Sequence, residues 1–260
     1  MSFFRLLRIT VLLSVLVIVA GNQWLTHARI SSWEKPIWMT IYPVLSDDAA
    51  ALLPYIESLH AGSFGDIGAF LERQGGAYGM ALQTPLKLQI APPLYQSPPA
   101  VPPGGKRLAT AIWSLKMRWW AWRRGREDNL PGADIQMFVI YHKTDGTPLP
   151  ERSVGVQKGM YGIVNAYASR AMASRNRVVI AHELLHVLGA TDKYQMATGQ
   201  PIMPEGLADP NLKPLYPQQK AEIMGGRIAL SRTRAVMPAS LRSCVVGQET
   251  AHEIGWFQSF

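Results

Sequence analysis

Residues 182–186 read His-Glu-Leu-Leu-His, which brings two imidazoles and a carboxylate into a five-residue stretch. Residues four apart share one face of a helix, so His182 and His186 can direct their imidazole nitrogens at one metal ion. Imidazole is a common zinc ligand, and a catalytic zinc takes three protein ligands and a water. Glu183 is turned about 100° around the helix from His182, so it can reach that water as a general base. The spacing indicates zinc-dependent hydrolysis.

The same residues have a simpler interpretation as a buried helix that carries two hydrogen-bonded histidines. The apolar residues at 184, 185, 187 and 188 would suit such a helix. The residues that follow favour the metal site instead. Gly189 stands where the helix must stop and turn sharply, a position that calls for positive φ. Asp192, six residues after His186, can then return as a third ligand.

The stretch HELLHVLGATD, residues 182–192, resembles the signature of the metzincin metallopeptidases, His-Glu-x-x-His-x-x-Gly-x-x-His. Asp192 stands at the last position, as in the snapalysin-like branch, which has aspartate there. The segments HELLHVLGATDKY, PLYPQQKAEIM and EIGW also resemble a group of uncharacterised exported bacterial proteins. The metzincin resemblance implies Zn²⁺ held by His182, His186 and Asp192, Glu183 as the catalytic base, and a peptide or protein substrate.

Metzincins also keep a methionine in a tight turn beneath the metal. Met224, which precedes two glycines, is the first candidate for this turn and Met203 the second. For either residue, a gap-filling core methionine is the competing interpretation. Some metzincins have a functional tyrosine just after the methionine, where this sequence has Gly226. Three other tyrosines stay open for that role: Tyr161, Tyr194 and Tyr216.

Three further residues have the chemistry of zinc ligands. Another class of zinc peptidase takes its third ligand from a glutamate on a second helix, and Glu205 lies at a fitting distance. The prolines and glycine around Glu205 argue against a helix there. A fourth ligand from Glu222 or His252 would close the site and make it structural. We expect instead a solvated Glu222 and a His252 at the edge of the core.

Residues 1–28 have the layout of an export signal. Arg5 and Arg8 precede an apolar run at residues 9–21. The run is short for a membrane span, which takes roughly 20 residues. An uncleaved inner-membrane anchor and a signal cleaved after Ala28 are therefore both open. Either one leaves the arginines inside and places residues 29–260 on the periplasmic side. The single cysteine, Cys244, excludes an intramolecular disulfide.

The composition is that of a folded protein with a moderate basic excess. Hydrophobic residues make up 48% of the 260 positions, enough for one core or for a core and a small lobe. The formal net charge of +8 permits an acidic partner or an anionic membrane surface. Nothing in the chain indicates nucleic-acid binding, and the oligomeric state cannot be read from it.

The pattern of apolar residues and turn formers predicts an α+β fold. Its expected parts are a twisted mixed β-sheet with backing helices, reaching to about residue 189, and a smaller C-terminal lobe at about 190–260. We expect strands at residues 36–48, 86–94, 133–143, 153–162 and 162–169, and helices at 47–62, 65–79, 106–128, 175–188 and 247–256. Ser174 can cap the helix at 175–188. The resemblance implies that this is the active-site helix, and that the strand near 154–159 is an edge that pairs with substrate.

The helix expected at 106–128 carries two apolar stripes. Five residues at steps of four and three form the first stripe: Leu108, Ile112, Leu115, Trp119 and Trp122. Trp113, Met117 and Trp120 form the second stripe beside it, and lysine and arginines occupy much of the remainder. Such a helix can rest on an anionic membrane surface. The alternative, which we expect, is a core helix with a solvated basic side.

The sequence thus predicts an exported zinc metalloendopeptidase. Two other classes stay open, a non-catalytic zinc-binding protein of the cell envelope and a zinc amide hydrolase that acts on cell-wall material.

Overall fold

The computed structural model describes residues 28–46, 49–102, 107–146 and 153–257, together with residues 4, 5, 7–10, 13, 14, 17 and 21. Much of the apolar run predicted as an export signal lies outside the described residues. Within the described ranges, no helix is both long and apolar enough to cross a membrane.

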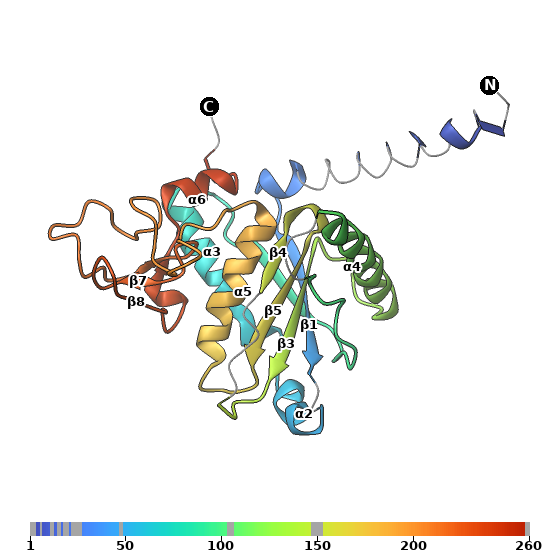
Figure 1. Ribbon diagram of the computed structural model, residues 1–260, viewed down its shortest axis with the longest axis horizontal. Coiled ribbons are helices and arrows are strands. Elements are labelled where there is room, and N and C mark those ends of the chain that lie inside the picture. Colours follow the sequence, from blue (N-terminus) through green and yellow to red (C-terminus); the bar gives the residue numbers. More distant parts are fainter. Residues whose placement is uncertain are drawn as a thin grey trace.

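A five-stranded mixed sheet forms the centre of the fold (Figure 1). Its strands lie in the order β2-β1-β3-β5-β4, and all neighbours are parallel except β4, which is antiparallel to β5. The predicted strands are confirmed with shorter bounds: β1 (Ile37–Leu45), β2 (Leu86–Ile90), β3 (Ile135–His142), β4 (Val154–Val156) and β5 (Tyr161–Tyr167). The strand β4 ends in a short 3₁₀ turn, η3 (Gln157–Gly159), and lies at one end of the sheet.

Helices cover both faces of this sheet. The helices α3 (Gly65–Ala77) and α5 (Ala173–Leu188) lie on one face, and α4 (Arg107–Glu127) lies on the other (Figure 1). The helix α2 (Ala49–Glu57) and the 3₁₀ turn η1 (Ala61–Phe64) join the core on the α5 side. The fold is therefore mixed α/β, with a mixed central sheet and backing helices, as the strand and helix patterns predict.

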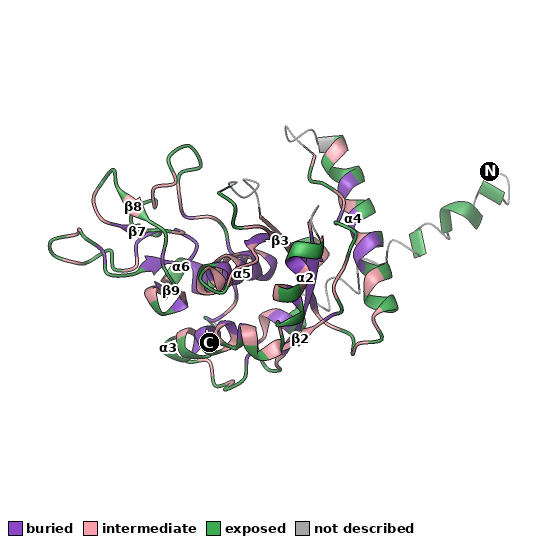
Figure 2. Cartoon of the chain, turned by 90° about the horizontal axis from the view of Figure 1, so that it is seen from below, coloured by how far each residue is buried: buried purple, intermediate pink, exposed green. Residues whose placement is uncertain are grey.

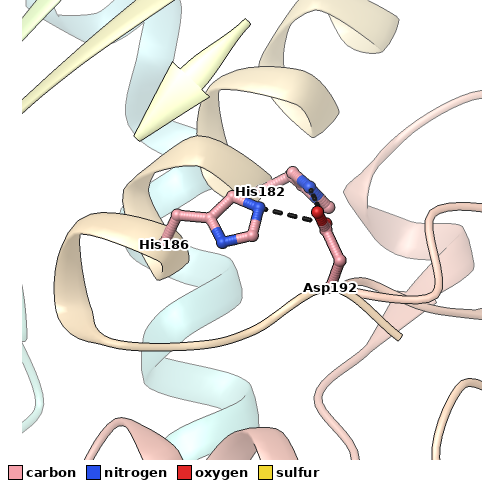
Figure 3. A group of neighbouring side chains, drawn as sticks. All are labelled: His182, His186 and Asp192. Atoms are coloured by element: carbon pink, nitrogen blue, oxygen red, sulfur yellow. Dashed lines mark hydrogen bonds and ion pairs between the residues drawn. The ribbon is translucent and has the colours of Figure 1, made fainter. Parts of the chain in front are cut away.

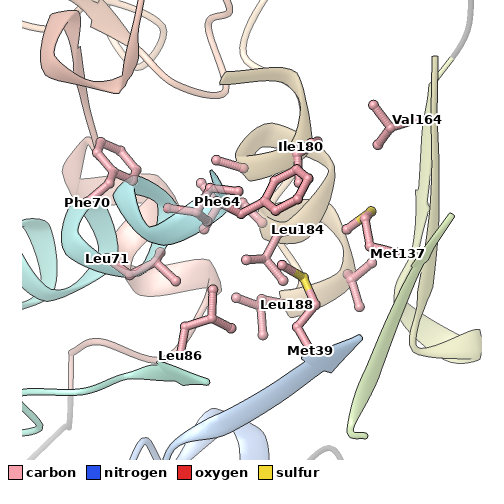
Figure 4. Close-up of a cluster of buried hydrophobic side chains, with 14 of the residues drawn as sticks. Met39, Phe64, Phe70, Leu71, Leu86, Met137, Val164, Ile180, Leu184 and Leu188 are labelled. Atoms are coloured by element: carbon pink, nitrogen blue, oxygen red, sulfur yellow. The ribbon is translucent and has the colours of Figure 1, made fainter. Parts of the chain in front are cut away.

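The main core lies between the sheet and α5 (Figure 4). Met39 and Met137 on the strands are fully buried, and they face Ile180 and Leu184, which are also fully buried on α5. Alternate residues of the same strands, such as Phe138, point to a second core beneath α4. Strands buried on both faces read as near-continuous apolar runs, as β1 and β3 do.

The helix α4 packs on the core, as expected, but only one of its two apolar stripes does so. The first stripe faces away from the sheet, and Leu108 is 74% exposed. The second stripe packs on the sheet instead, where Met117 is fully buried and the ring of Trp120 lies 4.8 Å from that of Phe138. The two stripes do not lie side by side as expected but on nearly opposite sides of the helix, so only one of them can contact the sheet. Helical periodicity does not contain the tertiary partners that decide between the stripes, here the aromatic residues of β3 and β5.

Of the two predicted ends of α5, only the C-terminal end is confirmed. The helix begins at Ala173, so Ser174 lies inside it and its predicted capping role is wrong. Ser174 Oγ accepts a hydrogen bond from Arg177, whose guanidinium also pairs with Asp66 of α3. The other end is as predicted: Gly189 stops the helix with φ of 118°.

The chain from 190 onward has short elements joined by long loops. Two parallel strands pair as β6 (Ala221–Glu222) with β9 (Cys244–Val245), and two antiparallel strands pair as β7 (Ile228–Ala229) with β8 (Ala235–Val236). A 3₁₀ turn, η4 (Leu241–Ser243), and a terminal helix, α6 (Gln248–Glu253), complete the region. Many of its buried apolar residues, such as Ile223, Val246 and Ile254, belong to the same core as α5.

Gly155 lets β4 lie directly on α5. A Cβ at this position would stand 2.3 Å from the carbonyl oxygen of Glu183 and 2.6 Å from Cβ of His186. Neither group can move unless the strand or the helix moves too. The absence of a side chain at residue 155 therefore sets the distance between the edge strand and the helix that carries the histidines.

We predict that Gly155→Ala lowers the free energy of unfolding by about 1–3 kcal/mol, because the methyl group overpacks this contact. Urea denaturation measures the change. Gly76→Ala in α3 is the matched control, since a Cβ there meets no atom within 4 Å. Equal stability of the Gly155→Ala variant and the wild type would contradict the close contact.

Candidate metal centre

Three side chains converge where α5 ends (Figure 3). His182 and His186 lie one turn apart on α5, and Asp192 comes from the loop that follows Gly189. Oδ1 of Asp192 lies 3.2 Å from Nε2 of His182 and 3.1 Å from Nε2 of His186. One potential ligand atom from each residue lies within 4.8 Å of the other two. The three predicted metal ligands are thus brought together.

Backbone carbonyls fix the orientation of both imidazoles. Nδ1 of His182 lies 2.9 Å from the carbonyl oxygen of Ile223, and Nδ1 of His186 lies 2.8 Å from that of Ala190. A carbonyl oxygen only accepts, so each Nδ1 carries hydrogen and donates it. Nε2 of each ring faces Asp192 and would be the ligand atom of a metal-bound imidazole, which is neutral. This arrangement is typical of histidines that bind metal ions.

The donor set fits a zinc ion. Ligand atoms at about 2.0–2.1 Å around a tetrahedral zinc stand roughly 3.3 Å apart, close to the two separations from Asp192. Burial acts to raise the pKa of Asp192, but hydrogen bonds with His182 and His186 outweigh it and hold the pKa well below its usual range. The carboxylate therefore stays ionised, and a carboxylate together with two imidazoles, which bind zinc in their neutral form, suits a divalent cation.

Glu183 lies beside the cluster and is only 5% exposed. The backbone N–H of Gly155 donates to its carboxylate, while the buried Oε2 has no hydrogen-bond partner among the described residues. Burial raises the pKa of Glu183, and the neighbouring His182 and His186 partly offset this rise. A carboxylate with one fixed oxygen, one free oxygen and a raised pKa is suited to accept and release a proton.

The loop that carries Asp192 is held on both sides. Lys193, which is 5% exposed, pairs with Glu253 of α6 at 2.7 Å. Glu253 also accepts from the backbone N–H of Thr191 at 3.0 Å, and the N–H of Lys193 donates to the carbonyl of Met224 at 2.9 Å. The sequence does not predict the pairing of Lys193 with Glu253. Lys193 lies in the segment HELLHVLGATDKY and Glu253 begins the segment EIGW, but nothing local pairs residues 60 positions apart.

Met224 lies in a closed turn next to His182. The N–H of Gly226 donates to the carbonyl of Glu222 at 3.0 Å, and Gly226 adopts φ of 70°. Met224 itself is fully buried, and the residue before it, Ile223, supplies the carbonyl that binds His182. Met203 does not share this position: it is 52% exposed, and its sulfur accepts a hydrogen bond from Tyr216.

None of the three rival ligands joins the cluster found among the described residues. Glu205 is exposed and lies outside any helix, and His252 is exposed on α6 instead of lying at the core edge. The predicted solvated position of Glu222 is wrong, since this side chain is fully buried. Its carboxylate accepts hydrogen bonds from the backbone N–H groups of Gly225 and Gly247, and the need of these buried donors for an acceptor explains its place.

The three tyrosines left open by the sequence are far from equivalent. Tyr161 is fully buried in the core under α4, and Tyr216 donates to Met203. Only Tyr194 lies near the histidines, with its ring centroid 6.4 Å from that of His182. Of the three, it is the tyrosine whose position is compatible with contact to a bound substrate.

We predict that Glu222→Gln destabilises the protein by about 1–3 kcal/mol, because its amide nitrogen would leave a buried backbone donor without an acceptor. Oε2 accepts from Gly225 at 2.7 Å, while Oε1 accepts from Gly247 at 3.1 Å and from the Thr250 hydroxyl at 2.8 Å. The melting temperature reports the effect. Glu205→Gln, the same change at an exposed site, is expected to leave it unaltered; equal losses in both variants would argue against the buried role.

No family model matches this chain, and a search of curated proteins gives no match. Among solved structures, a chain in one described as "Structure of a chaperone-substrate complex" is similar over 85% of this chain, with 13% identity and a TM-score of 0.42. This chain spans 33% of the length of that one. A likeness this weak carries no argument about function, so the geometry of the site has to stand by itself.

Proposed function

We propose that this protein is a zinc metallopeptidase of the metzincin type that acts outside the cytoplasm. In this proposal His182, His186 and Asp192 hold the zinc, Glu183 is the general base, and Met224 forms the turn beneath the site. One observation carries it: three ligand atoms converge within 4.8 Å beside a buried glutamate oxygen that has no partner among the described residues.

The chemistry follows from these groups. A bound zinc ion would polarise the scissile carbonyl and lower the pKa of the attacking water. The backbone N–H of Gly155 donates to the carboxylate of Glu183, and Oε2 has no partner among the described residues. In the proposal, Oε2 is therefore the oxygen that accepts the proton of that water. The raised pKa of Glu183 lets it keep the proton and then deliver it to the leaving amine.

The edge strand supports a polypeptide substrate. Within the described sheet β4 is a terminal strand, paired with β5 on one side. An extended peptide can add to such an edge through main-chain hydrogen bonds. Because Gly155 of β4 touches both Glu183 and His186, a peptide on this edge would pass close to the proposed base.

We predict about one zinc ion per chain in the purified protein, measured by elemental analysis. Asp192→Ala removes one of only three protein ligands and is expected to abolish or greatly weaken zinc binding. Chelation should lower the melting temperature of the wild type, because a ligand that binds the native state stabilises it.

His252→Ala is the matched control, because His252 is exposed and is expected to leave the zinc content unchanged. Zinc retained in Asp192→Ala would mean that another residue is the third ligand. The absence of zinc from the wild type would leave two histidines on a buried helix and would end the enzyme proposal.

We predict that Glu183→Gln keeps zinc and loses hydrolysis of an unstructured protein such as casein by roughly 10²–10⁴-fold or more, the usual contribution of a general base. Glu249→Gln, at an exposed position of α6, is the control and should retain full activity. Wild-type rates in Glu183→Gln would exclude Glu183 as the base. Activity on peptidoglycan fragments but not on protein would identify a cell-wall amide hydrolase instead.

A further inference from the structure

Five large apolar side chains on the outer face of α4 are exposed to solvent. Figure 2 shows that much of this helix has the colour of exposed residues. The exposed fractions of the five side chains are 74% for Leu108, 46% for Ile112, 68% for Leu115, 58% for Trp119 and 55% for Trp122. These residues recur along one side of the helix, so they form a continuous stripe and not scattered exposures. A contiguous apolar patch of this kind marks an interaction surface.

The fold itself does not require this stripe. The opposite side of α4 already supplies the contact with the sheet, through Trp113, Met117 and Trp120, and each is at most 8% exposed. The indole N–H of Trp113 also donates to the carbonyl of Pro99 at 2.9 Å. Two tryptophans therefore pack in the core. The other two, Trp119 and Trp122, make none of the contacts that hold α4 to the sheet.

Basic residues flank the exposed stripe. The chain has no acidic residue between positions 107 and 126, and the basic side chains of α4 in that interval whose surroundings are described are Lys116, Arg118, Arg123, Arg124 and Arg126. Arg126 lies over the ring of Trp122 at 4.6 Å, and Arg123 lies over that of Trp119 at 5.7 Å. Glu127 binds Arg123 and Arg124, which leaves Lys116 and Arg126 outside any acidic pairing described.

Tryptophan next to arginine or lysine is the composition of helices that lie in a membrane interface. The indole rings occupy the headgroup level, and the long basic side chains reach the phosphates. A basic side of the helix that is simply solvated, or that binds an acidic partner, would explain the charges but not the five exposed apolar side chains. An ordinary apolar partner would explain the stripe but not the positive charges of Lys116 and Arg126 beside it.

The start of the folded region lies at the same edge as this stripe. Arg29 pairs with Asp134, and Asp134 lines one hollow together with Trp122 and Arg126. Eight residue steps separate Gly21 from Arg29, which allow a span of at most about 29 Å. If residues 9–21 act as the predicted anchor, the bilayer that holds them is within reach of α4.

We propose that α4 docks on an anionic lipid bilayer. Its apolar stripe enters the headgroup region, and Lys116 and Arg126 bind lipid phosphates. This docking is independent of the peptidase chemistry, because it uses neither a residue of the metal centre nor the zinc ion.

The test uses the full chain with Leu115→Cys labelled by an environment-sensitive NBD dye. The native Cys244 is 1% exposed, so it does not compete for the label. Vesicles contain phosphatidylcholine alone or with phosphatidylglycerol, and carry a spin-labelled lipid as quencher. We expect a blue shift, higher emission and quenching with the anionic vesicles. A label at Met196→Cys, which is 71% exposed far along the chain from α4, should stay in water in both.

Charge reversal separates surface docking from simple tethering by the N-terminal segment. Lys116→Glu with Arg126→Glu should reduce the quenching at position 115 to that at position 196, while the circular dichroism spectrum stays unchanged. High salt should have the same effect, since it screens exposed charges. These results would support docking through lipid phosphates.

Three results would overturn the proposal. A label at 115 that stays in water with anionic vesicles would exclude docking. Equal quenching with and without phosphatidylglycerol would exclude a role for the basic residues. A blue shift that rises with protein concentration and needs no vesicle would show that a second copy of the chain covers the stripe.

Discussion

The packing of α5 on the mixed sheet is the constraint on which the candidate metal centre depends. Ile180 and Leu184 of this helix are fully buried against the strands, and burial of such side chains is worth about 1.5–3 kcal/mol each. The direction of the apolar face decides where the remaining positions point. His182 and His186 lie one turn apart on the other side, and both rings therefore face the loop that returns after Gly189.

The rest of the centre consists of segments that fix groups from outside the helix. Each imidazole is held by a backbone carbonyl, one from the turn around Met224 and one from the residue after Gly189. The Asp192 loop is joined to α6 by the ion pair of the buried Lys193 with the partly exposed Glu253. The carbonyls and this ion pair restrict rotation of the side chains, so the protein alone holds the three candidate ligand atoms in place, which is how second-layer groups support metal sites.

The sequence predicts the features that are local in the chain. The strand positions follow from apolar runs, and the end of α5 follows from Gly189, because a helix that must turn with positive φ favours glycine. The convergence of His182, His186 and Asp192 also follows from spacing along one helix and one short loop. The sequence does not contain the distant partners: it leaves open which stripe of α4 meets Phe138 and how Glu253 reaches Lys193, and the prediction for Glu222 is wrong because Gly247 is far along the chain. The capping role predicted for Ser174 is an error of another kind, because the helix begins one residue earlier, at Ala173.

The sheet also has a consequence for access. The helices α4 and α5 cover opposite faces of the same strands (Figure 1), so the thickness of the sheet and its side chains separates the outer stripe of α4 from Asp192. A surface that contacts α4 therefore approaches one face of the sheet, and a molecule that contacts the histidines approaches the other face. A large surface can therefore contact the α4 side of the molecule without blocking the approach of a second molecule to the histidines.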